Sequence, residues 1–221
     1  MSGNLATARS NSAILSTNKL IRNTYTLLSL TLLFSAFTAT VSVFLRMPPM
    51  TYLVSIIGAF LLMWLVLPKT ANSAKGLGVV FAITGLMGFA LGPMLNMYLS
   101  LPNGPSIIAT ALAGTGIIFL GLSGYALTTK RDFSFLGGFL FVGLLVVFGV
   151  ALLNIFLGIP ALSLALSAAI VMLMSGFILF DTSRMVNGGI DNYVIATVQL
   201  YVNIFNLFVS LLHLLGFANN E

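Results

Sequence analysis

Five polar side chains interrupt the last apolar stretch of the chain, residues 193–217. They are Gln199, Asn203, Asn206, Ser210 and His213, and successive members are four, three, four and three residues apart. On a helix this spacing places all five on one face. A membrane-spanning helix exposes such a face to lipid only at a cost, because hydrocarbon offers it no hydrogen bonds. We therefore expect the face to meet other helices or a water-filled path.

Asp181 is the acidic residue best placed for chemistry. It follows the apolar run 177–180 at the end of the sixth apolar stretch. One interpretation is an interfacial carboxylate, solvated by water or paired with Arg184 three residues further on. The other is a gate or a proton-binding site, for which Lys69 after the second stretch is a candidate partner. The residues alone leave both interpretations open.

The composition is typical of a membrane protein. Of 221 residues, 59% are hydrophobic and 6% are charged, and the mean hydropathy is +1.11. A chain of this kind belongs in a lipid bilayer. The net charge of +5 does not indicate nucleic-acid binding, because the basic residues lie in short loops between apolar stretches. With no cysteine and one histidine, we expect no metal site and no cofactor.

Seven apolar stretches predict an all-α membrane protein of seven transmembrane helices, with the polar-faced last helix central in the bundle. Residues 1–23 predict a mobile cytoplasmic tail, 24–217 a single seven-span domain and 218–221 a short external carboxyl end. Glycines seven residues apart in the third stretch predict close approach between helices. The stretches are 24–45, 51–67, 77–99, 106–127, 135–157, 161–180 and 193–217, and the glycines are Gly78, Gly85 and Gly92.

The basic residues predict the orientation. Eight of them fall in the amino-terminal segment and alternate loops, and one, Arg46, falls on the opposite side. Positive loops face the cytoplasm, so the amino terminus is predicted inside and the carboxyl terminus outside. A re-entrant last stretch would return the carboxyl end to the inside, although about 25 residues are long enough to cross. The eight are Arg9, Lys19, Arg22, Lys69, Lys75, Lys130, Arg131 and Arg184.

This topology argues against a serine protease built from Ser123 and His213. Ser123 is predicted near the inner surface and His213 near the outer end of the last span. At 1.5 Å per residue their depths differ by roughly 20 Å, whereas a nucleophile and its base must lie about 3 Å apart. We therefore predict that the protein is not an enzyme. For His213 an interfacial, hydrogen-bonded histidine is favoured over a pH sensor.

Four segments in order resemble the Bax inhibitor-1 family. They read GFALGPML at 88–95 with ALAGTGIIF at 111–119, TKRDFSFLGG at 129–138, FDT at 180–182 and YVNIFNLF at 201–208. The resemblance covers nearly the whole chain after the amino-terminal segment. One minor departure is Gly116, where the family signature usually has alanine.

The resemblance implies two activities. For a bacterial member it implies a multi-pass inner-membrane regulator that binds and modulates the membrane-bound, ATP-dependent protease FtsH. The alternative that it implies is a pH-sensitive leak channel for calcium or protons, gated by a pair of aspartates on the last two spans. The first aspartate matches Asp181, but the second falls at Asn203. An Asp–Asn pair cannot share a proton between two carboxylates, which weakens the channel interpretation. The expected gate or ion path comprises Asp181, Asn203, Asn206, Gln199, Lys69 and His213.

Overall fold

The computed structural model describes the backbone of residues 2–218 and the side chains of residues 15–218. This part of the chain is helical and contains no strand. The second span is continuous but changes type, from α2 through a five-residue π-helical segment to α3. The helices are α1 (Ser2–Phe44), α2 (Met50–Leu61), the π segment (Leu62–Val66), α3 (Leu67–Thr70), α4 (Ala74–Leu99), α5 (Gly104–Thr129), α6 (Leu136–Leu157), α7 (Pro160–Val186) and α8 (Tyr193–Ala218).

Seven helices of the described part are long and apolar enough to cross a membrane, which confirms the predicted seven-span, all-α fold. Two bounds differ usefully from the prediction. The predicted sixth stretch ends at residue 180, whereas α7 continues to Val186 and contains Asp181. The helix α1 begins at Ser2 and so includes most of the predicted tail, whereas its candidate membrane span is Leu15–Phe44; the mobility of the tail stays a prediction. Of the predicted external end, residues 219–221 lie outside the described residues.

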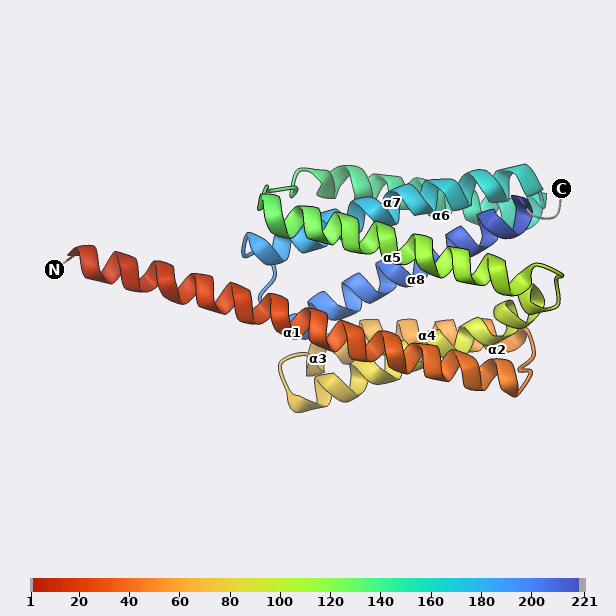
Figure 1. Cartoon of the computed structure of the whole chain (residues 1–221), viewed down its shortest axis with the longest axis horizontal. Coiled ribbons are helices and arrows are strands. Elements are labelled where there is room, and N and C mark those ends of the chain that lie inside the picture. Colours follow the sequence, from red (N-terminus) through yellow and green to blue (C-terminus); the bar gives the residue numbers. More distant parts are fainter. Residues whose placement is uncertain (1, 219–221) are drawn as a thin grey trace.

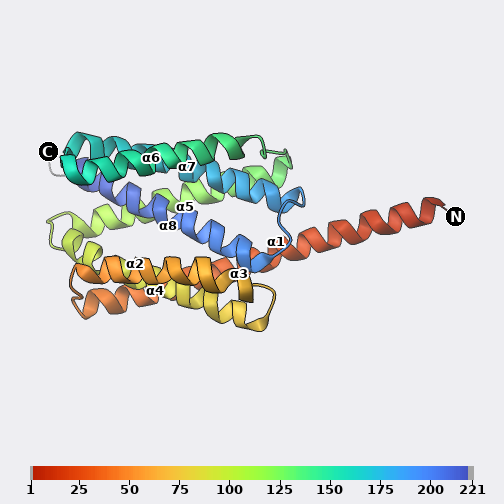
Figure 2. The same ribbon diagram turned by 180° about the vertical axis from the view of Figure 1, so that it is seen from behind.

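The last helix is the centre of the bundle, as predicted. In Figures 1 and 2, α8 runs obliquely between one group formed by α5, α6 and α7 and another formed by α1, α2 and α4. It packs against α1, α4, α5 and α7. The helices α2 and α6 are peripheral, since α2 packs mainly on α4 and α6 on α7. The start of α1 and the end of α8 lie at opposite ends of the molecule (Figure 1).

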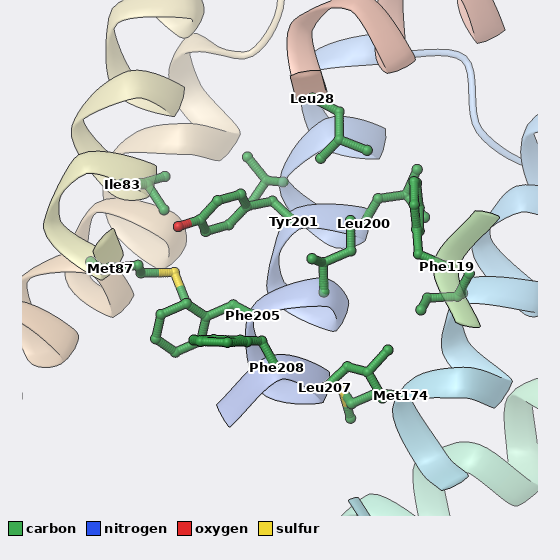
Figure 3. Close-up of a cluster of buried hydrophobic side chains, with 14 of the residues drawn as sticks. Leu28, Ile83, Met87, Phe119, Met174, Leu200, Tyr201, Phe205, Leu207 and Phe208 are labelled. Carbon is green, nitrogen blue, oxygen red and sulfur yellow. The ribbon is translucent and has the colours of Figure 1, made fainter. Parts of the chain in front are cut away.

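The core surrounds α8 with apolar side chains from its neighbours. Leu200 and Leu207 are completely buried, and Figure 3 shows them beside Phe119 and Met174. Tyr201 is 1% exposed and points toward α4. Its hydroxyl donates a hydrogen bond to the carbonyl of Thr84 (3.1 Å) and accepts one from Ser35 (2.5 Å). One side chain of α8 thereby links α1 and α4, with its polar atom satisfied.

Close contact between α1 and α4 depends on glycine. A Cβ atom on Gly88 would meet the carbonyl oxygen and the hydroxyl of Ser35, and one on Gly92 would meet Ser42. A Cβ atom on Gly85 would lie 2.7 Å from the Phe34 ring. Such small residues let the backbones approach and gain van der Waals contact, which replaces the hydrophobic effect inside a membrane. The prediction holds for Gly85 and Gly92 but is wrong for Gly78, which has open space around it.

One end of the bundle carries most of the positive charge, and we call it the basic end. It comprises the loops 71–73, 130–135 and 187–192 with the adjoining helix ends (left in Figure 1). Asn192 joins two parts of it. Its side-chain oxygen accepts from the backbone N–H of Val194 at the start of α8 (2.8 Å), and its amide donates to Ala71 (3.1 Å). The basic residues at this end are Lys69, Lys75, Lys130, Arg131 and Arg184.

The glycine contact predicts a measurable difference between two alanine substitutions. Gly88→Ala should lower the free energy of unfolding by about 1–3 kcal/mol, because its Cβ would press on the α1 backbone. Gly78→Ala is the matched control on the same helix and should be neutral or slightly stabilising, since alanine favours a helix. Unfolding of the two purified variants in detergent micelles would measure this. Equal stability of the two would contradict the α1–α4 contact.

Candidate functional site

A groove of about 940 Å³ lies against one side of α8. Its walls come from the second span and α6, and α7 and α8 form its floor. Figure 2 shows α8 running between α2 and α6 on this side of the molecule. Most of the lining is apolar. The polar lining residues all come from α7 and α8, and they are Asp181, Arg184, Gln199, Asn203 and Asn206.

Asp181 and Asn203 form the centre of this polar floor. The amide Nδ2 of Asn203 donates to Oδ2 of Asp181 at 2.7 Å, and the two side chains are 6% and 5% exposed. The contact depends on α7 continuing past its apolar run, which carries the carboxylate onto the face that meets α8. A charged acceptor strengthens a hydrogen bond inside a low-dielectric interior. The structure thus brings together Asp181 and Asn203, the two positions that the family resemblance matches to the pair of gate aspartates.

Arg184 and Lys69 are the predicted charge partners of Asp181, and the structure gives both of them other surroundings. The guanidinium of Arg184 donates to the carbonyl of Gly189 (2.9 Å) and stands over the Phe180 ring, 5.4 Å from its centroid. It nevertheless lines the groove, at the basic end. Lys69 is exposed and follows Pro68, which lines the opposite wall. Arg184 therefore lines the site and Lys69 does not, while the hydrogen bond of Asp181 goes to Asn203.

Gln199 and Asn206 continue the polar floor on either side of Asn203. The amide of Asn206 donates to the carbonyl of Val202 in its own helix at 2.8 Å. The side-chain oxygen of Gln199 is buried and has no hydrogen-bond partner within residues 15–218. A buried acceptor of this kind normally finds a partner in a protein group, a water or a ligand. Three of the five polar positions on α8 thus face a hollow, as the helix periodicity predicts.

The remaining two positions of that polar face lie beyond the groove. Ser210 is buried, and His213 is exposed near the end of α8 opposite to the basic end. Nδ1 of His213 lies 2.8 Å from the hydroxyl of Ser167 on α7, in agreement with the hydrogen-bonded histidine that the sequence predicts. His213 does not line the groove that holds Asp181.

Ser123 and His213 have separate partners. The Ser123 hydroxyl lies 2.8 Å from that of Tyr25 and 3.2 Å from that of Thr182, near the basic end. His213 contacts Ser167 at the other end. The structure therefore does not assemble the serine–histidine pair.

Several residues of the site region were missed by sequence reasoning. Trp64, the sole tryptophan, lines the groove from the π segment. Ser183 donates to the carbonyl of Arg131 (2.9 Å) and accepts from the N–H of Phe133 (2.9 Å), which fastens the loop 130–135 to α7. These contacts join residues about 50 positions apart, so no local pattern signals them.

A smaller, apolar cavity of about 300 Å³ lies on the other side of α8, between α1, α4 and α5. Gly116, the position where the family signature usually has alanine, lines it. A Cβ atom there would meet nothing within 4 Å, so this departure does not change the helix packing.

The hydrogen bond between α7 and α8 predicts unequal effects for two asparagines. Asn203→Leu should lower the free energy of unfolding by about 1–2 kcal/mol, because it leaves the buried Asp181 carboxylate without its donor. Asn206→Leu is the matched control and should cost less, because its amide bonds only to its own helix. Thermal or denaturant unfolding in micelles would compare the two. A larger loss for Asn206→Leu would contradict the assignment of the Asp181–Asn203 bond.

Comparison with known proteins agrees with the resemblance seen in the sequence. The family model described as inhibitor of apoptosis-promoting Bax1 matches residues 17–220. An uncharacterized membrane protein of Vibrio cholerae is 52% identical over 207 residues, which cover 94% of this chain and 93% of the relative. The Escherichia coli protein named modulator of FtsH protease YccA is 49% identical over 217 residues, covering 98% of each chain. An uncharacterized protein of Pseudomonas aeruginosa is 49% identical, covering 91% of this chain and 90% of the relative. The chain therefore belongs to the Bax inhibitor-1 family of membrane proteins.

Proposed function

We propose that this protein is a multi-pass inner-membrane regulator that binds and modulates an FtsH-type membrane protease. One observation carries the proposal: a relative that is 49% identical, and covered almost end to end, is named a modulator of FtsH protease. A related Escherichia coli sequence of equal identity is named an inner membrane protein. The long α1 helix, which projects beyond the bundle at the basic end (Figure 1), supplies an accessible segment for such a partner.

The proposal includes an orientation. The basic end faces the cytoplasm, because short positively charged loops are retained on that side of the membrane. The amino terminus is then cytoplasmic and the carboxyl terminus external. An ATP-dependent protease that works from the cytoplasm would meet the projecting part of α1 and the loops 71–73, 130–135 and 187–192.

Co-purification tests the partner directly. The full chain with a carboxyl-terminal tag should recover FtsH from native membranes solubilised in mild detergent, in cells whose FtsH is proteolytically inactive. A tagged, unrelated seven-span protein at the same expression level is the control. Degradation of a membrane substrate by active FtsH should slow when the chain is overproduced. Absence of FtsH from the recovered material, with an unchanged degradation rate, would refute the proposal.

A second function, an ion leak path, is supported by the Asp181–Asn203 hydrogen bond in the polar floor of the groove. The carboxylate of Asp181 attracts cations, and its hydrogen bond with Asn203, which joins α7 to α8, would act as a latch. Calcium takes six to eight oxygen ligands, whereas Asp181 is the one carboxylate that lines this groove. The described residues also contain no cluster of three or more acidic, histidine or cysteine residues. A weak path for a partly hydrated ion fits this lining better than a tight calcium site.

Flux into liposomes between pH 5 and 8 tests the second function. Asp181→Asn should raise calcium or proton flux and flatten its pH dependence, because the variant replaces the carboxylate, which is both the acceptor of the latch and its titratable group. Asp132→Asn is the matched control at the same end of the bundle. Hydrogen bonds from Ser134 hold the pKa of Asp132 below its ordinary value, so Asp132 stays charged over this range. If neither the folded wild type nor the folded Asp181→Asn variant gives measurable calcium or proton flux, the leak path is refuted.

A further inference from the structure

The groove has features that neither protease binding nor an ion latch uses. It is large, it is mostly apolar, and it carries a cation at the basic end. We propose that the groove binds a phospholipid from the leaflet at the basic end. The phosphate would lie at Arg184, an acyl chain would follow the apolar walls, and a hydrogen-bond donor of the headgroup would meet the polar floor. This goes beyond the proposed function and does not depend on it.

The walls give a lipid chain access from the side. Because α2 packs on α4 and α6 packs on α7, the two walls of the groove belong to different parts of the bundle. Their rims are apolar and exposed: Phe60 is 49%, Trp64 77% and Phe148 62% exposed. These residues lie within membrane-spanning helices, so the exposed rims face hydrocarbon. An acyl chain can therefore enter laterally without crossing a polar barrier.

The basic end of the groove suits a phosphate. Arg184 lies in the last turn of α7 and lines the groove, and one hydrogen bond, to Gly189, is assigned to its guanidinium. A guanidinium has five N–H donors in a planar fork, which matches phosphate oxygens. Lys69, which does not line the groove, lies next in sequence to the lining residue Pro68 and carries a positive charge at the same end of the bundle. Positive charge at the membrane end of a groove is where a lipid headgroup lies.

The polar floor of the groove presents hydrogen-bond acceptors to a ligand. The side-chain oxygen of Gln199 is buried without a partner within residues 15–218, and Asp181 offers a carboxylate three residues before Arg184. Both groups are acceptors, and the headgroup ammonium of an ethanolamine lipid could donate to them. The quaternary ammonium of a choline lipid has no N–H, so it would leave Gln199 unpaired. We therefore expect ethanolamine phospholipids to bind more tightly than choline phospholipids.

Size and chemistry together favour a lipid over a transmembrane helix of another protein. The volume of about 940 Å³ lies at the upper end of the range of about 300–1,000 Å³ that is usual for small-molecule sites. An apolar helix in the groove would cover the side-chain oxygen of Gln199 without giving it a hydrogen-bond donor. That arrangement is costly inside a membrane.

Trp64 provides the experiment, because it is the sole tryptophan and lines the groove. The delipidated full-length protein in an uncharged detergent is titrated with phosphatidylethanolamine that carries brominated acyl chains, which quench tryptophan fluorescence on contact. We expect saturable quenching. Brominated diacylglycerol, which lacks the phosphate, should give only weak quenching without saturation. Brominated phosphatidylcholine should saturate at a severalfold higher concentration.

Three variants locate the lipid. Arg184→Gln should raise the half-saturating concentration roughly tenfold, through loss of charge-assisted hydrogen bonds. Arg131→Gln, at an exposed arginine of the same end that does not line the groove, should leave it unchanged. Ala151→Phe should abolish saturation by filling the α6 wall, where Ala151 lines the groove. Thermal unfolding of each variant confirms that it is folded.

Other results would overturn the proposal. Equal quenching by phospholipid and diacylglycerol would mean simple partition into the detergent shell. Quenching that stays saturable in both Arg184→Gln and Ala151→Phe would place the lipid outside the groove. If cross-linking from position 148 in native membranes captures a protein helix rather than a lipid, the groove is a protein docking site and the lipid assignment fails.

Discussion

The need to keep the polar face of α8 away from lipid governs this structure. Hydrocarbon supplies no hydrogen bonds, so each polar group on a spanning helix must find a partner in the protein or in trapped water. The bundle meets this need by placing α8 among α1, α4, α5 and α7. Outer helices such as α6 carry apolar side chains toward the lipid, for example Phe139 and Phe156, which are 72% and 88% exposed.

The two sides of α8 meet that constraint in different ways. On one side, Tyr201 reaches Ser35 and Thr84, and the glycine contacts hold α1 tightly on α4. On the other side, the packing is incomplete and leaves the groove, whose floor holds the Asp181–Asn203 bond and the unpaired oxygen of Gln199. Dense packing stabilises the bundle, whereas the hollow concentrates the polar groups that are available to an ion or a ligand. The close contact between α1 and α4 and the polar floor of the groove thus lie on opposite sides of one helix.

The Asp–Asn pair sets this chain apart from the two-aspartate gate that the family resemblance implies. Asn203 donates a hydrogen bond through an amide that does not titrate, so the link between α7 and α8 needs no shared proton. Hydrogen bonds also hold the loops of the basic end. Ser183, Asn187 and Asn192 fasten the loops there to α7 and α8. These contacts are compatible with a docking surface on that side of the membrane.

The sequence by itself determined the class, the seven spans and the central place of α8, because hydropathy and a helical repeat of polar residues are local properties. It also placed Gln199, Asn203 and Asn206 on one face, and the family resemblance paired Asp181 with Asn203. Tertiary structure alone decided that α7 carries Asp181 beyond its apolar run, that Arg184 turns to Gly189, and that His213 contacts Ser167 far from the groove. It alone left a hollow between the second span and α6. These features depend on which helices pack together and which leave a gap. Contacts between residues far apart in the chain produce no periodic pattern in the sequence, so local periodicity does not predict them.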